Sequence, residues 1–239
     1  RQLLQTVLTA KGLERGEPDE LFSVEEIEQK NWNEEWEKDF QPVIVGDFCA
    51  IRAGFHEKIP GVQYDLIITP KMSFGTGHHA TTYMMIEAMR SIDFYAEKVL
   101  DFGTGTGVLA ILAEKLGSVD IRAIDLDDWS IENAAENIAA NQAVHISLEL
   151  KDSLEGEDVF DIILANISLQ VILQNLGALW QHLDENGVII ASGVLQSDEV
   201  QIRQNAAKEG FLMNILFIRD NWMSFSLKKQ KISGEFAEV

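Results

Sequence analysis

Hydrophobic positions after residue 71 alternate between short apolar runs and longer segments in which apolar residues recur every three or four positions. The first pattern is typical of buried strands and the second of helices packed on them. The pattern predicts strands at 98–102, 120–125, 147–150, 159–165, 188–192, 211–218 and 222–227, and helices at 79–91, 108–116, 129–141, 169–183 and 198–209. This alternation indicates an α/β fold with a doubly wound, mostly parallel, seven-stranded sheet.

Two connections refine this prediction. Asn186-Gly187 is a helix-stop signal, and we expect it to end the helix that begins at residue 169. The turn 219–221 is too short for a crossover connection. The two strands that flank it are therefore expected to pair antiparallel, as a hairpin at one edge of the sheet.

The first 41 residues have a different pattern and form a separate segment. Trp32, Trp36 and Phe40 recur every fourth residue, and Ser23 with Glu26 has the form of a capping box. They predict a helix over 24–39 whose aromatic stripe packs on the main body rather than binding a ligand. Short strand-like runs follow at 43–45, 48–51 and 66–68. We therefore divide the chain into a linker segment, 1–41, and a main domain, 42–239.

Composition narrows the functional classes. The 239 residues are 46% hydrophobic and 24% charged, with a formal net charge of −20. A field of this sign repels phosphate backbones, so we expect no direct nucleic-acid binding and favour a basic protein or a small molecule as the partner. Cys49 is the only cysteine, and no Cys/His spacing suits a metal. Without a long apolar run or a signal-peptide pattern, a cytoplasmic protein with no membrane association is expected. Nothing in the sequence indicates an oligomeric state.

The strongest local motif is a glycine loop between the strand 98–102 and the helix 108–116, with glycines at alternate positions: Gly103, Gly105 and Gly107. Such a turn lets backbone N–H groups and a helix N-terminus approach a ligand closely. Asp125 ends the next strand, where a carboxylate can accept hydrogen bonds from both ribose hydroxyls. Alternatively, Asp125 is a helix N-terminal charge, although Asp127 or Asp128 already suits that role.

The spacing of the glycines bears on the choice of ligand. Dinucleotide sites usually have G-x-G-x-x-G, whereas the third glycine here comes one position earlier. Asp101, two residues before the loop, suits a cationic ligand better than a pyrophosphate. S-adenosylmethionine has a sulfonium and an ammonium group but no phosphate, so charge matching favours it over NAD.

At these residues the sequence resembles the class I S-adenosylmethionine-dependent methyltransferases, which have a Rossmann-like fold. Three stretches, 71–82, 160–167 and Asn31-Trp32 with Trp36, resemble the PrmA family, the methyltransferases of ribosomal protein L11. The resemblance runs from about residue 24 to about 228. It implies methylation of lysine side chains and the N-terminal amine of a basic ribosomal protein. It also implies that residues 1–41 are the remnant of a substrate-recognition domain and its linker.

Carried over by position, the family's cofactor contacts fall on Thr82, Gly103, Asp125 and Asn166. His78, Ala80 and Thr104 depart from the residues common in the family. Asn166 is also the candidate catalytic residue, because its carbonyl oxygen could orient the acceptor amine; alternatively, it caps the helix beginning near Ser168.

Three further residues are candidate cofactor contacts. Phe74 and Thr76 lie in the loop before the first strand of the sheet, where Phe74 closes over the ligand or fills the core. Asp152 binds the adenine amino group or is an exposed acid in a turn. His79 is a weaker candidate for a base, because a single histidine before a helix more often caps or packs.

Other functions remain open at this stage. The acceptor could be another protein or a small-molecule amine. A module that binds S-adenosylmethionine without catalysis is disfavoured by the intact glycines, Asp125 and Asn166. An NAD-dependent reductase is disfavoured by the glycine spacing.

Overall fold

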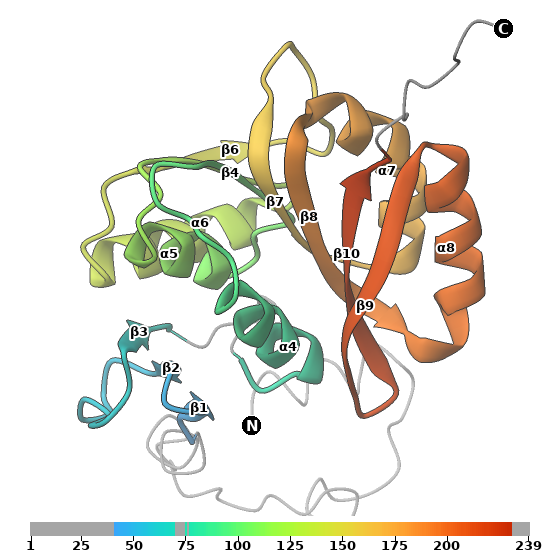
Figure 1. Ribbon diagram of the computed structural model, residues 1–239. Helices are drawn as coiled ribbons and strands as arrows, with labels where there is room; N and C mark the ends of the chain where they lie inside the picture. Colours follow the sequence, from blue (N-terminus) through green and yellow to red (C-terminus); the bar gives the residue numbers. More distant parts are fainter. Residues whose placement is uncertain (1–40, 70–74, 76, 231–239) are drawn as a thin grey trace, which may run out of the picture. The chain divides into compact units, whose positions relative to one another are not determined.

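The computed structural model describes residues 41–69, 75 and 77–230. Its main feature is a seven-stranded sheet with the strand order β6-β5-β4-β7-β8-β10-β9 (Figure 1). The strands are β4 (Lys98–Phe102), β5 (Asp120–Asp125), β6 (Ile146–Leu150), β7 (Phe160–Asn166), β8 (Leu183–Leu195), β9 (Phe211–Arg219) and β10 (Trp222–Lys229). The first five pair in parallel, whereas β10 pairs antiparallel with both β8 and β9. The predicted parallel sheet and its edge hairpin are confirmed.

Helices cover both faces of this sheet, as Figure 1 shows. They are α4 (Ala80–Met89), α5 (Val108–Lys115), α6 (Asp128–Ala140), α7 (Leu169–His182) and α8 (Glu199–Lys208), with a short 3-10 turn, η1 (Gln196–Asp198), before the last. α5 contacts both α4 and α6, while α7 contacts α8. The buried hydrophobic residues correspondingly form two clusters, one with α4 and α5 and one with α7. The sheet is therefore doubly wound.

One predicted strand boundary is wrong. α7 ends at His182, within one residue of its predicted end at 183, but β8 begins at once with Leu183 instead of at residue 188, so the Asn186-Gly187 stop signal lies inside this strand. Leu183 pairs with Phe160, and a register shift brings Val188 opposite Ile162. Leu183 is buried in the core, so packing and strand pairing end the helix four residues before the local stop signal.

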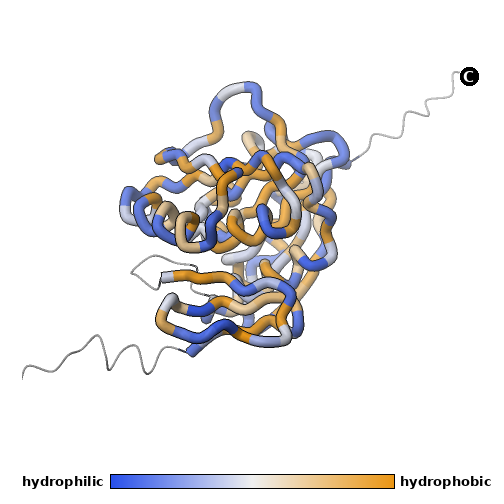
Figure 2. Tube along the Cα trace, turned by 90° about the vertical axis from the view of Figure 1, so that its left-hand side faces the viewer, coloured by the Kyte–Doolittle hydropathy of each residue, from blue (hydrophilic) through white to orange (hydrophobic). Residues whose placement is uncertain are grey.

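A second, three-stranded sheet precedes α4 and contains β1 (Val43–Val45), β2 (Cys49–Arg52) and β3 (Tyr64–Ile67). β1 and β2 are antiparallel, and β2 and β3 are parallel. Its interior residues join the core around α5. In Figure 2 hydrophobic residues are concentrated along the strands and helices, and hydrophilic residues at the turns.

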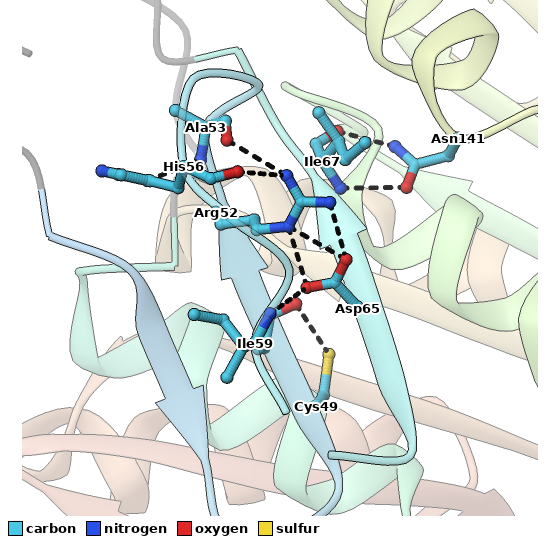
Figure 3. A network of polar contacts seen from close by, with 9 residues as sticks. Cys49, Arg52, Ala53, His56, Ile59, Asp65, Ile67 and Asn141 are labelled. Carbon is cyan, nitrogen blue, oxygen red and sulfur yellow. Dashed lines mark hydrogen bonds and ion pairs between the residues drawn. The ribbon is translucent and has the colours of Figure 1, made fainter. Parts of the chain in front are cut away.

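A largely buried ion pair joins β2 to β3 in the three-stranded sheet. Arg52 Nε donates to both carboxylate oxygens of Asp65, at 3.0 and 2.9 Å, and an Nη atom of Arg52 donates to the His56 carbonyl at 2.9 Å (Figure 3). Each charge is thereby paired and hydrogen-bonded, which buried charges require.

The predicted helix over 24–39 and its aromatic stripe lie outside the described residues. Within the described part of the chain, no helix is long and apolar enough to cross a membrane.

Candidate active site

A cavity of about 420 Å³ opens at the carboxyl ends of β4, β5 and β7. β4 lies between β5 and β7 in the sheet, so the strand order reverses here, which is where doubly wound folds bind ligands. The cavity is lined by Gly75, Phe102, Gly103, Thr104, Gly105, Val108, Leu109, Asp125, Leu126, Asp127, Ser130, Lys151, Asp152, Asn166, Ile167, Ser168 and Val171.

The glycine loop forms one wall of this cavity. Gly103 and Gly105 line it, and Gly107 is the N-cap of α5. The N–H of Gly103 donates to the Ile124 carbonyl at 2.9 Å, which holds the loop against the end of β5. Gly103 has φ +79°, and a Cβ atom there would overlap the side chain of Ile167. Any other residue would therefore disturb the wall.

Asp125 lies at the end of β5 and faces the cavity, as predicted for a ribose-binding carboxylate. Its two oxygens accept hydrogen bonds from the N–H of Gly105 (2.9 Å) and of Asp127 (3.1 Å). Asp127, rather than Asp125, caps α6 by accepting the N–H of Trp129 at 3.2 Å. The alternative role of Asp125 as the helix-terminal charge therefore does not hold.

Asp101 lies behind the glycine loop and does not line the cavity. Its Oδ2 accepts hydrogen bonds from Thr104 Oγ1 at 2.7 Å and from the Ala110 N–H at 3.2 Å. Complete burial raises the pKa of this carboxyl to about 7, the two hydrogen bonds oppose the shift, and the nearby charge of Asp125 adds to it. Asp101 thus supports the loop, and the structure does not bring it to a ligand directly.

Asn166, the last residue of β7, presents an unpartnered oxygen. Its Nδ2 donates to Oγ1 of Thr82 at 3.2 Å, and Thr82 is fully buried on α4 outside the lining residues. The Oδ1 atom of Asn166 is shielded from solvent and has no hydrogen-bond partner among the described residues. Asn166 does not cap α7, because the N-cap residue is Ser168. The alternative capping role is therefore wrong.

Of the remaining candidate residues that the structure describes, only one lines the cavity. Asp152 lines the cavity and is exposed, while Phe74 and Thr76 lie outside the described residues. His79 caps α4 through its ring nitrogen and contacts Trp222 edge-on, with ring centroids 4.9 Å apart, as expected for a capping and packing residue. No group of metal-binding side chains occurs in the described part of the chain.

Sequence reasoning missed most of the apolar wall. Leu126, Ile167 and Val171 line the cavity beside the predicted polar residues. Leu126 directly follows Asp125 and is 71% exposed. Its position next to this acid could have identified it as a residue of the cavity wall. Ile167 and Val171 follow Asn166, and an apolar residue at the start of a helix gives no comparable signal.

The doubly wound sheet, its edge hairpin and a glycine loop at the switch point define the class I methyltransferase fold. A solved methyltransferase from Pyrococcus furiosus shares this fold, with a TM-score of 0.57 and 20% identity, covering 69% of this chain and 89% of that one. A solved ribosomal protein L11 methylase from Lactobacillus delbrueckii subsp. bulgaricus superposes with a TM-score of 0.74 and 28% identity, covering 80% of this chain and 100% of that one.

Sequence comparison identifies the family. The family model described as ribosomal protein L11 methyltransferase (PrmA) matches residues 2–230. The ribosomal protein L11 methyltransferase of Phocaeicola vulgatus is 40% identical over 204 residues, which are 84% of this chain and 73% of that protein. That of Chlorobaculum tepidum is 39% identical over 210 residues, 85% of this chain and 72% of that protein. The chain belongs to the ribosomal protein L11 methyltransferase (PrmA) family.

Proposed function

We propose that this protein transfers methyl groups from S-adenosylmethionine to amino groups of ribosomal protein L11, on lysine side chains and at the N-terminus. The family match and the names of its relatives support the acceptor. The observation that most directly supports the chemistry is the buried, unpartnered Oδ1 of Asn166 in the cavity wall. A buried acceptor without a partner is costly in a finished fold, so a ligand N–H is its natural complement.

The cavity suits S-adenosylmethionine, which would supply an electrophilic methyl group on a positively charged sulfur. Three carboxylates line it, Asp125, Asp127 and Asp152, against one cationic side chain, Lys151. This balance favours a cationic ligand over a dinucleotide with a pyrophosphate. The assigned contacts are Asp125 for the ribose, Asp152 for the adenine amino group, and Gly103 and Gly105 for close backbone approach. Phe74, Thr76 and Thr82 are kept as candidate contacts, with Asp101 and Gly107 supporting the loop.

Asn166 would orient the acceptor nitrogen. An amine must be neutral to attack, whereas the ordinary pKa of a lysine amine is about 10.4. Burial against Ile167 and Val171 favours the neutral form, and the Asn166 carbonyl oxygen can accept one amine hydrogen so that the lone pair points to the methyl group. Because Thr82 holds the other end of the amide, the direction of this oxygen is fixed before the substrate arrives.

We assign this chemistry to residues 42–239, the methyltransferase domain, and interpret residues 1–41 as a linker segment and the remnant of a substrate-recognition domain. The described residues from Gln41 onward belong to one compact unit, which supports this division.

The proposal is tested by two measurements on the full chain. Calorimetry with S-adenosylmethionine and with NAD should give saturable binding of the first alone. Mass spectrometry of purified L11 incubated with enzyme and cofactor should then show added methyl groups on amines. Cofactor binding with transfer only to another protein or to small amines would replace L11 as the acceptor. Binding without transfer to any amine would indicate a non-catalytic module.

A further inference from the structure

Three asparagines follow one face of α6, because Asn133 and Asn137 on the helix and Asn141, its C-cap, are spaced four residues apart. Asn133 and Asn137 are fully buried. Their side chains bond to backbone atoms of the segment around the end of β3. Asn133 Nδ2 donates to the Thr69 carbonyl at 3.4 Å, and Asn137 Oδ1 accepts the Thr69 N–H at 2.8 Å. The side chains of α6 thus fasten this segment to the helix that follows Asp125.

Asn141 bonds to the same segment one turn further along the helix. Its Oδ1 accepts the Ile67 N–H at 3.0 Å, and its Nδ2 donates to the Ile67 carbonyl at 2.6 Å (Figure 3). Both contacts lie at the end of β3, and neither reaches the glycine loop.

Asn137 differs from Asn141 because its Nδ2 donates to the Thr106 carbonyl at 2.8 Å. That carbonyl would ordinarily accept the N–H of Ala110, four residues on, at the start of the helix. The Ala110 N–H instead donates to Asp101. Among the described residues, Asn137 therefore supplies the hydrogen-bond donor for the Thr106 carbonyl.

Thr106 connects this contact to the cavity. It lies between Gly105, which lines the cavity, and Gly107, the N-cap of α5. Its Oγ1 also donates to the carbonyl of Gly75 at 3.0 Å, and Gly75 lines the cavity as well. Asn137 thus holds a residue that joins two parts of the cavity wall, without lining the cavity itself.

We infer that Asn137 is a positioning residue for cofactor binding. By satisfying the buried Thr106 carbonyl, it fixes the glycine loop and Gly75 at the separation that the ligand requires. This inference rests on the proposed use of S-adenosylmethionine and adds a residue that touches neither cofactor nor acceptor.

The test compares Asn137→Leu with Asn141→Leu in the full chain. Both substitutions replace an amide by an apolar group of similar size, at a buried position for Asn137 and a half-buried one for Asn141, but only the first leaves the Thr106 carbonyl unpartnered. Calorimetry with S-adenosylmethionine should show the Kd raised by about 5- to 100-fold for Asn137→Leu, the range that an unsatisfied buried group gives, and by less than about twofold for Asn141→Leu. At saturating cofactor, kcat of Asn137→Leu should stay within about threefold of wild type, because Asn166 is untouched.

The outcomes are distinguishable. Equal Kd values for Asn137→Leu and wild type would overturn the inference, and so would equal weakening by the two asparagine variants, which would mean a general structural effect. If Asn137→Leu does not fold, as judged by circular dichroism, Asn137→Ala removes the same hydrogen bonds without adding bulk and is held to the same expectation. Failure of wild type to bind S-adenosylmethionine would instead refute the proposed function.

Discussion

Two buried oxygens near the glycine loop have no hydrogen-bond partner among the described residues: Oδ1 of Asn166 and Oδ1 of Asp101. Each costs free energy in the folded protein, because a buried polar atom has lost its water. Asn166 lines the cavity, where a bound amine can supply the missing donor, whereas Asp101 lies behind the loop, where no ligand reaches it. The first oxygen therefore bears on the proposed catalysis and the second on stability.

Replacing Asn166 by Ala removes the acceptor that orients the amine but no group assigned to hold the ribose. We expect the methyl-transfer rate to fall about a hundredfold, while the Kd of S-adenosylmethionine changes by less than about threefold. Single-turnover assays at saturating cofactor and calorimetry separate the two quantities. Asn175→Ala is the matched control, because the Asn175 amide bonds to the Val171 carbonyl within α7 and does not line the cavity. Equal rates for wild type and Asn166→Ala would exclude the orienting role.

Asp101 makes the stability of the fold depend on pH. Its pKa is about 7 in the folded protein, against an ordinary value of 3.8, chiefly because the group is buried. The folded state then holds the proton more tightly than the unfolded state. The stability that this group contributes is complete below about pH 4 and is lost as the pH rises through 7.

Asp101→Asn should remove this dependence, because the amide oxygen can still accept from Thr104 and does not ionise. The Tm of the variant should fall less between pH 5 and pH 8 than the Tm of wild type. At pH 8 the Tm of the variant should be at least as high as that of wild type. Asp128→Asn, an exposed acid on α6, is the control and should leave the profile of wild type unchanged. A wild-type profile in Asp101→Asn would show that this carboxyl does not titrate as proposed.

At the scale of elements, the ends of three strands converge on one residue. Ile167 follows β7, its side chain packs against Gly103 after β4, and its backbone packs against Gly193 in β8. A Cβ atom at Gly193 would overlap the Ile167 carbonyl, and Gly193 has φ +88°. Asn166 and Ser192 are paired across the same two strands. Close packing of β8 on the end of β7 therefore sets the position from which Asn166 reaches the cavity.

Gly193→Ala tests this packing at a site outside the cavity wall. We expect a loss of about 1–2 kcal/mol from the positive φ and a further ~1–3 kcal/mol from crowding against Ile167, together with a lower transfer rate. Gly156→Ala is the control, since Gly156 also has a positive φ, +100°, but its Cβ would meet nothing within 4 Å. Denaturant unfolding and single-turnover rates measure both effects. If the two variants lose the same stability and rate, the crowding at Ile167 has no role.

Comparing the predicted with the observed bounds of the strands and helices shows which elements the sequence could predict. The bounds predicted for β4 and β5 are those observed, because buried parallel strands leave continuous apolar runs that end in Gly or Asp. The predicted start of β8 was wrong, because the pairing of Leu183 with Phe160 depends on a strand more than twenty residues away. Local signals do not contain that information.

For the site, the sequence predicted which residues meet but not which of them face the cavity. Gly103, Asp125 and Asn166 come together because neighbouring parallel strands end at one edge of the sheet. Asp101 and Thr82 lie behind that edge, a matter of side-chain direction that spacing alone does not settle. Asn137 was missed because a polar residue in a helix is usually solvated, and only the fold places it against Thr106.

At the scale of the whole molecule, the net charge is −20 and the sequence pI is about 4.5. Charge of one sign attracts an oppositely charged partner over distances beyond direct contact and speeds its association. We propose that the acceptor is a basic protein, in which case this charge should assist its encounter with L11. The proposed cofactor, by contrast, would be held by short contacts within the cavity. The two binding steps should therefore respond differently to ionic strength.

Raising the salt concentration from 50 to 300 mM should lower kcat/KM for L11 by about tenfold, because screening shortens the reach of the protein's field. Over the same range the Kd of S-adenosylmethionine should change by less than about threefold, since partly buried interactions are screened much less. Initial rates at saturating cofactor and parallel calorimetry measure the two responses. A small-amine acceptor that the enzyme methylates, if one is found, serves as an internal control and should show little salt dependence. A kcat/KM for L11 that does not change with salt would mean that the acidic surface has no part in recruiting the acceptor, and that contacts close to the cavity select it.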